Sequence, residues 1–235
     1  MRGKASTVAL AVVLAVADAL LLAANVAHLR VDERGREPLT FFSPSRWSGA
    51  LDGSYVETLG HAQLAAAVVV LALVAARCRS VVLAVWTLVL GVVLADDARQ
   101  LHERGGAALV RALDLPAVAG LRAADLGELT FWALSGTTLG ALLLATHRRA
   151  RGAERRQSWA LARLLAVLAF FAVIVDMLHI AVAGRVAGPV EATVGLLETA
   201  GELGVMTAVL LAVVRSATRV GAPGAGERGC WRRMS

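Results

Sequence analysis

Two pairs of metal-binding residue types occur at helical spacing near the end of this sequence of 235 residues. Asp176 and His179 lie three residues apart in the string DMLH, and Glu198 and Glu202 lie four apart in ETAGE. On an α-helix each pair projects from a single face, so two neighbouring helices could hold one cation between them. Carboxylates mixed with imidazole suit zinc, iron or manganese. We therefore predict a divalent metal, Zn or Fe, bound by Asp176, His179, Glu198 and Glu202.

A second polar string, DDARQLHE, begins at Asp96. If one helix continues through it, Asp96, Gln100 and Glu103 share a stripe, and His102 points about 100° away from Glu103. An acid and an imidazole beside a metal can transfer protons or hold a ligand imidazole in place. We expect Asp97 and His102 to be catalytic.

The elements that carry these residues must be membrane-spanning helices. The chain is 57% hydrophobic and 18% charged, with a mean hydropathy of +0.66, which excludes a soluble enzyme and a disordered chain. A helix needs about 20 apolar residues to cross a hydrocarbon core of about 30 Å. Six segments meet this length or nearly so, and they cover residues 6–29, 58–77, 80–101, 126–146, 159–182 and 191–214. The sequence predicts an all-α integral membrane bundle of six transmembrane helices over residues 1–220, with a basic, disordered cytoplasmic tail over 221–235.

The distribution of charge predicts the orientation of this bundle. Of the 24 Lys and Arg residues, 14 fall on the side that holds both termini and nine on the other. Positive residues stay in the cytoplasm, so both termini are predicted to be cytoplasmic in a multi-pass protein of the plasma (inner) membrane. Because these charges lie between apolar runs rather than on one face, we expect membrane lipid as a partner and no nucleic acid.

The acidic residues gather on the opposite, outer side. Only Glu154 and Glu227 of the 18 acids lie on the cytoplasmic side, and four of the five histidines fall at outer ends of spans. Glu198 and Glu202 lie about 10 Å and 16 Å along the sixth span, and Asp18 is equally deep. A charged residue at the membrane centre costs about 2.5–3.5 kcal/mol, so several carboxylates together cost on the order of 10 kcal/mol. A bound cation, or protonation, is needed to offset this cost.

Structural explanations compete with the site at several of these residues. Asp125, Glu128 and Glu191 fall at predicted helix N-termini, where a carboxylate caps backbone donors. His28 and His61 suit the polar interface of the membrane. Even the deep group next to Gly195, Gly201 and Gly204 is consistent with close helix packing and an internally satisfied hydrogen-bond network.

The string from Asp96 to Glu103 resembles the DDxxxLHE signature of a loose group of uncharacterised bacterial multi-spanning membrane proteins. The later LLETAGELG stretch is similar to their acidic span, and Asp176 matches a lone intramembrane Asp there. The sequence departs from this group at Glu202, where a basic residue is expected. The Asp and His pattern is also broadly similar to membrane hydrolases of the alkaline ceramidase superfamily, although those have seven spans. This second resemblance implies a hydrolase.

The sequence leaves several functions open. The first is a metal-dependent membrane enzyme with a site near the outer leaflet, which acts on a lipid or other hydrophobic substrate by zinc-assisted hydrolysis or di-iron oxidation. The alternatives are a proton- or cation-coupled transporter or channel with a relay through Asp18, a b-type haem electron-transfer protein with two outer histidines, and a non-catalytic assembly subunit.

The predicted orientation can be tested by cysteine accessibility. Single cysteines introduced near Gly49 and Gly106 should react with a membrane-impermeant reagent added from the outside, because both loops lie on the arginine-poor side. Labelling only from the cytoplasm would reverse the orientation and remove the argument for an outward site.

Overall fold

The computed structural model describes residues 2–33, 41–42, 44–49, 51, 53–118, 121–182, 185–186 and 188–220. The predicted tail, residues 221–235, lies outside this range. The described chain is all-α, and its only β-type pairing is an isolated bridge between Val118 and Leu121. Its elements are α1 (Arg2–Glu33), the short 3-10 helix η1 (Ser45–Trp47), α2 (Tyr55–Cys78), α3 (Val81–Arg99), α4 (Leu101–Leu113), α5 (Ala123–Arg149), α6 (Gly152–Ala169), the π-helix η2 (Phe170–Val175), α7 (Asp176–Val182) and α8 (Gly188–Val220).

The six predicted spans are confirmed. In the described chain, six segments are long and apolar enough to cross a membrane, namely Ala5–Arg30, Tyr55–Cys78, Val81–Arg99, Ala123–Arg149, Gly152–His179 and Gly188–Val220. They form the all-α bundle of six transmembrane helices that the sequence predicts.

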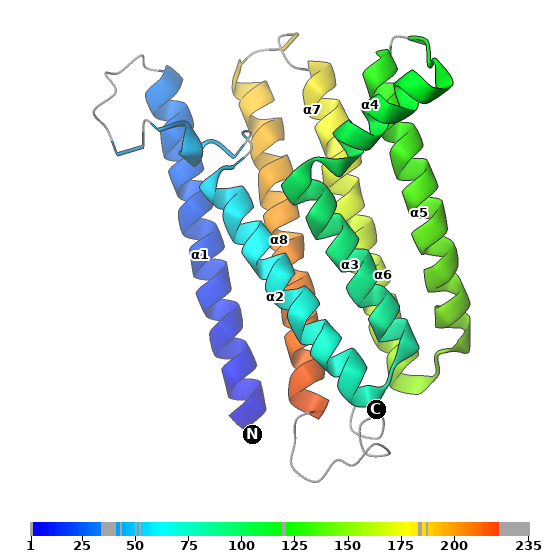
Figure 1. Ribbon diagram of the computed structural model, residues 1–235. Coiled ribbons are helices and arrows are strands. Elements are labelled where there is room, and N and C mark those ends of the chain that lie inside the picture. Colours follow the sequence, from blue (N-terminus) through cyan, green and yellow to red (C-terminus); the bar gives the residue numbers. More distant parts are fainter. Residues whose placement is uncertain are drawn as a thin grey trace.

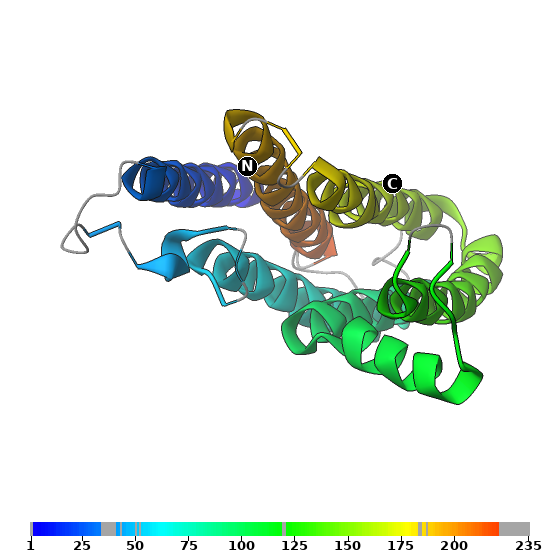
Figure 2. The ribbon, with the colours of Figure 1, turned by 90° about the horizontal axis from the view of Figure 1, so that it is seen from above.

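The spans pack in two rows. Figure 2 shows α1, α8 and the α6–α7 segment in one row and α2, α3 and α5 in the other. The central element is α8, which contacts α1, α2, α6, η2 and α7, whereas α5 packs mainly on α3 and α4. Large apolar side chains of α1 such as Val13 and Leu20 are exposed, as expected for a helix that faces lipid.

The two ends of the bundle differ in packing. At the end where α1 begins and α8 finishes, here called the terminal end, Trp86, Leu83, Leu161 and Val213 are almost completely buried. Trp86 also donates its indole N–H to the Ser158 hydroxyl at 2.8 Å. This half is mainly an apolar core, in which a few buried polar side chains such as Ser158 and Ser80 are hydrogen-bonded between helices. The opposite end, here called the cavity end, carries α4 and the connections into α2 and α8 (Figure 1).

The end of the third span differs from the approximate prediction in a way that matters for the site. The third span does not continue to residue 101, because α3 ends at Arg99 and Gln100 adopts a left-handed conformation with φ 51° and ψ 48°. The Gln100 N–H bonds to the carbonyls of Asp96 and Asp97 and caps the helix, and α4 begins in a new direction at Leu101. The predicted stripe of Asp96, Gln100 and Glu103 therefore does not exist. This turn moves His102 onto a separate helix.

The fifth span contains a π-helical turn directly before Asp176. The hydrogen bonds of the π-helix over Phe170–Val175 span one residue more per turn than those of an α-helix. The extra residue rotates the side chains that follow it, from Asp176 onward, around the axis of the span. Gly201 of α8 lies opposite, where an added Cβ would overlap the Phe171 ring. A glycine at this position lets α8 approach the π-helix closely.

The role of Gly201 predicts a difference between two glycines on α8. Gly201→Ala should lower the free energy of unfolding by about 1–3 kcal/mol because the new methyl group overpacks against Phe171. Gly204→Ala is the control, since nothing lies within 4 Å of its Cβ position and alanine favours a helix by up to about 1 kcal/mol. Unfolding of the detergent-solubilised protein measures both. Equal stability of the two variants would contradict the close contact.

Candidate functional site

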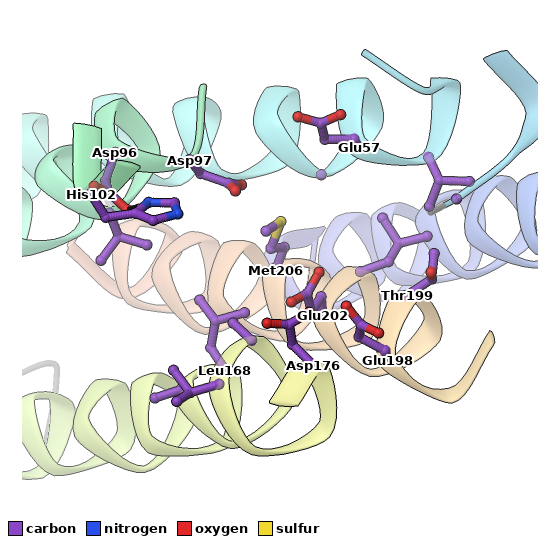
Figure 3. Close-up of a pocket in the computed structure, with 18 of the residues that line it drawn as sticks. Glu57, Asp96, Asp97, His102, Leu168, Asp176, Glu198, Thr199, Glu202 and Met206 are labelled. Atoms are coloured by element: carbon purple, nitrogen blue, oxygen red, sulfur yellow. Dashed lines mark hydrogen bonds and ion pairs between the residues drawn. The ribbon is translucent and has the colours of Figure 1, made fainter. Parts of the chain in front are cut away.

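A cavity of about 490 Å³ opens inside the cavity end of the bundle. Its walls come from α2, α3, α4, α5, the α6–η2–α7 segment and α8. Apolar side chains such as Leu168 and Met206 line part of it. Figure 3 shows the carboxylates of Asp176, Glu198 and Glu202 close together on the α7–α8 wall. The cavity thus combines apolar walls with an unusual number of acids.

His102 is paired with Asp96 on the α3–α4 side of the cavity. Its Nδ1 lies 2.9 Å from Asp96 Oδ2, and the Asp96 residue is only 3% exposed. Trp132 of α5 stacks on the imidazole with ring centroids 6.0 Å apart. If Nδ1 carries the proton, the carboxylate fixes that tautomer and leaves Nε2 as a free base. The other oxygen, Asp96 Oδ1, is buried without a hydrogen-bond partner in the described chain.

His61 forms a second pair with Asp97. His61 Nε2 lies 2.8 Å from Asp97 Oδ2 and 3.7 Å from Glu57 Oε1, so one imidazole joins α2 to α3 between two acids. The Asp97 side chain is 46% exposed, against 4% for the Asp96 side chain. Asp97 and His102, the predicted catalytic residues, both line the cavity but each bonds to a different partner.

The predicted metal ligands lie on neighbouring elements but are not all turned into the cavity. Asp176, Glu198 and Glu202 line it, while His179 Nδ1 lies 2.8 Å from Glu198 Oε2. The His179 ring rests against Gly195, where an added Cβ would be 2.9 Å from Cε1. Among the residues that the structure describes, no three His, Cys, Asp or Glu side chains are arranged to hold a metal ion. The metal stays a prediction from the sequence.

Asp18, the deep acid of the first span, belongs to a separate hydrogen-bond network. Its Oδ2 accepts a 2.6 Å bond from the Thr207 hydroxyl and its Oδ1 accepts a 2.9 Å bond from Gln63 Nε2. The network ties α1 to α2 and α8. It satisfies both carboxylate oxygens within the bundle, which is a structural role for Asp18.

Polar residues at the cavity end of α1 hold the segment that leads into α2. His28 Nδ1 bonds to the Phe42 carbonyl at 2.7 Å, and Asn25 Oδ1 accepts the Gly49 N–H at 3.1 Å. Gly49 itself lines the cavity and packs against Thr199, so this segment forms part of the cavity wall. His28 therefore anchors a connection, and its position at the membrane interface stays a prediction.

The capping role predicted for Asp125 agrees with the start of α5. Asp125 Oδ2 accepts the Arg122 backbone N–H at 2.8 Å, and Oδ1 lies 2.7 Å from Arg122 Nη2. The hydrogen bond to the Asp125 carboxylate, with its negative charge, raises the pKa of the exposed Arg122 guanidinium above its usual value. Asp125 is engaged at the start of α5 and does not line the cavity.

Sequence reasoning missed two features of the site. It assigned His61 to the interface, although His61 lies between Glu57 and Asp97, and it chose Asp97 where the buried partner of His102 is Asp96. The first could have been found from the i, i+4 spacing of Glu57 and His61. The second depends on the turn at Gln100.

The fold and its spans define a helical membrane-spanning protein. A family model described as Domain of unknown function (DUF8692) matches residues 7–217, and the chain belongs to this family. Neither a curated protein nor a solved structure matches the chain.

The Asp18 network can be tested with two substitutions at Thr207. Thr207→Val removes the hydroxyl at nearly constant shape, leaves Asp18 Oδ2 without its donor, and should cost about 1–3 kcal/mol of unfolding free energy. Thr207→Ser keeps the hydroxyl and should retain most of the stability. A valine variant as stable as the wild type would show that Asp18 does not need this bond, and would reopen its assignment to a proton relay.

Proposed function

We propose that this protein is a membrane enzyme that acts on a lipid or other hydrophobic substrate inside the cavity. The observation that carries the proposal is the Asp96–His102 pair, in which a buried carboxylate lies 2.9 Å from an imidazole on the cavity wall. In enzymes, a carboxylate that orients a histidine leaves the far ring nitrogen free to remove a proton from a reacting group and to return it later.

The position and lining of the cavity support a hydrophobic substrate. Val93, Leu203 and Met206 give it apolar walls between helices that span the membrane. Ligand pockets of about 300–1,000 Å³ hold molecules of drug size, and this cavity falls in that range. A substrate dissolved in the bilayer would reach the cavity without crossing water.

Proton transfer by His102 fits hydrolysis of such a substrate. The imidazole would activate a water molecule and then protonate the leaving group. We give no step to a metal, because no three suitable side chains in the described residues are arranged for one. The zinc or iron predicted from the sequence is therefore tested by measuring the metal content of the purified protein.

Transport through the bundle has less support. The acids cluster at one end, while the terminal end is filled by Leu83, Trp86 and Leu161. A proton- or cation-conducting path would have to open this packed half. An enzyme needs only a cavity that opens at one end of the bundle. The arginines at the terminal end, among them Arg77 and Arg149, support placing that open end outward.

The enzyme proposal predicts a lipid change that depends on His102. The purified protein is placed in nanodiscs containing a total membrane lipid extract, and the lipids are followed by mass spectrometry. The wild type should convert at least one species, and His102→Ala should slow conversion about 100-fold or more because the general base is lost. Asp97→Ala should also reduce turnover, since it removes the partner of His61 at the cavity.

Glu103→Ala is the matched control, because Glu103 is the exposed neighbour of His102 and does not line the cavity. Metal analysis of the same chelator-free samples shows whether zinc or iron accompanies activity, and whether Glu198→Ala or Glu202→Ala removes it. A wild type that converts no lipid, or a His102→Ala variant with full activity, would refute the proposal.

A further inference from the structure

An arginine lies inside the fifth membrane-spanning segment, away from the cavity. Arg163 lies about 16 Å along this segment, which begins with α6 at Gly152 and extends to His179. Arg163 is exposed, and in the part of the chain that the structure describes it has no ion pair or hydrogen bond with another side chain. A charged side chain on the lipid side of a span is compensated at the membrane interface. The compensating group for Arg163 therefore comes from outside the bundle.

Arg163 belongs to a stripe of basic and aromatic residues on one face of α6. Arg156 precedes it by seven residues and Trp159 by four, so the three residues lie within about 60° of each other around the helix axis. All three are exposed, and Trp159 is 51% exposed. Ser158 and Leu161, on the opposite side of α6, are buried. The stripe therefore faces away from the bundle, toward the membrane.

The direction of α6 brings the three side chains to one level. The Cα–Cβ bonds of an α-helix tilt toward its N-terminus, and α6 begins at the terminal end (Figure 1). The long Arg163 side chain can thus extend back toward Trp159 and Arg156. Trp159 packs against His147 of α5, with ring centroids 5.0 Å apart. Because tryptophan is enriched at membrane interfaces, this level corresponds to the headgroups of the leaflet at the terminal end.

The surroundings of the stripe are strongly positive. From His147 to Arg163 the chain has one acid and six exposed arginines, which are Arg148, Arg149, Arg151, Arg155, Arg156 and Arg163. The acid is Glu154, which lies about 180° from Arg163 around α6 and accepts a 2.6 Å hydrogen bond from Ser80 Oγ. It is turned toward α3 and does not neutralise the stripe. Charge complementarity therefore favours a ligand with a net negative charge.

The stripe and the residues beyond it fit a phosphate group attached to hydrocarbon chains. Guanidinium groups bind phosphate oxygens through two parallel hydrogen bonds, and the stripe supplies two such groups. Val167 and Phe170 continue the same face toward the cavity end and are 43% and 50% exposed. An acyl chain next to the bound phosphate would lie along these apolar side chains. This combination favours a phospholipid over a soluble phosphate.

We propose that α6 carries a binding site for an anionic phospholipid of the leaflet at the terminal end. The lipid phosphate lies between Arg156 and Arg163 beside Trp159, and an acyl chain lies along Val167 and Phe170. None of these five residues lines the cavity, so the site is separate from the candidate functional site. The inference does not rest on the enzyme proposed above.

Binding is tested by native mass spectrometry of the detergent-solubilised protein. The protein is titrated with dioleoyl phosphatidylglycerol or dioleoyl phosphatidylcholine, which share their chains and phosphate and differ in net charge. The first phosphatidylglycerol should bind at a concentration at least tenfold lower than the first phosphatidylcholine. A large molar excess of inorganic phosphate should not displace it, because the acyl chains contribute to binding.

The arginines are tested by neutral substitutions. Arg163→Gln and Arg156→Gln should each reduce the preference for phosphatidylglycerol at least fivefold, because each removes one guanidinium partner of the phosphate. Arg163→Lys keeps the charge without the paired hydrogen bonds and should give an intermediate value. Arg77→Gln is the matched control, since Arg77 is an exposed arginine at the same end on α2, which packs mainly on α8 and α3.

Equal binding of the two lipids would overturn the inference. So would an equal loss of preference in Arg77→Gln and Arg163→Gln, which would mean that net charge alone attracts the lipid. Displacement by inorganic phosphate would assign the stripe to a soluble anion instead. A dimer that Arg163→Gln dissociates would assign it to a second copy of the chain. Arg163→Gln should leave thermal unfolding in phosphatidylcholine nanodiscs unchanged, and a lowered midpoint would show a structural role for Arg163 in place of lipid binding.

Discussion

The cavity end of this bundle is organised by the free-energy cost of carboxylates at membrane depth. Each charged residue near the membrane centre costs about 2.5–3.5 kcal/mol unless it is compensated. The chain meets this cost in several ways. Asp18 is held by Gln63 and Thr207, whereas Asp96, Asp97 and Glu198 each have a histidine partner from another helix. Because these partners bridge helices, compensation of charge also fixes how α1, α2, α3, α4, α7 and α8 are placed around the cavity.

This polar end depends on the apolar half below it. Trp86 packs between α3 and α6 and donates to Ser158, which also bonds to His147 of α5, so a small hydrogen-bond network ties three helices together within the apolar packing of the terminal half. Close approach at Gly201 and Gly60 brings α8 against the π-helix and against α2. The π-helix then sets the direction of Asp176. The helices are thus held in place by packing at the terminal end. At the cavity end, local backbone changes such as the turn at Gln100 and the π-helix decide which side chains come into contact.

The sequence was sufficient for the fold because span length and charge are properties of continuous segments. The six spans, the collection of acids at one level and the capping by Asp125 all follow from local pattern. The choice of hydrogen-bond partner for each acid does not follow from local pattern. Whether His102 meets Asp96 or Asp97 depends on one residue, Gln100, in a left-handed conformation that no local pattern of apolar residues predicts. In the same way, the extra residue of the π-helix rotates Asp176 and His179 relative to α8, so that His179 bonds to Glu198 and rests on Gly195.

The hydrogen-bond partners divide the acids by role. Asp18 has both oxygens satisfied within the protein, which is the arrangement expected of a group that stabilises the fold. Asp96 has one oxygen held and one buried without a partner. Such a half-satisfied carboxylate is costly to the folded protein, so Asp96 is retained against a stability cost that Asp18 does not carry. Since Asp96 belongs to α3 whereas Asp176 and Glu202 belong to α7 and α8, the cavity lies between the two rows of the bundle. A substrate bound there would contact both rows, and because it would bind only the folded state it would also stabilise that state.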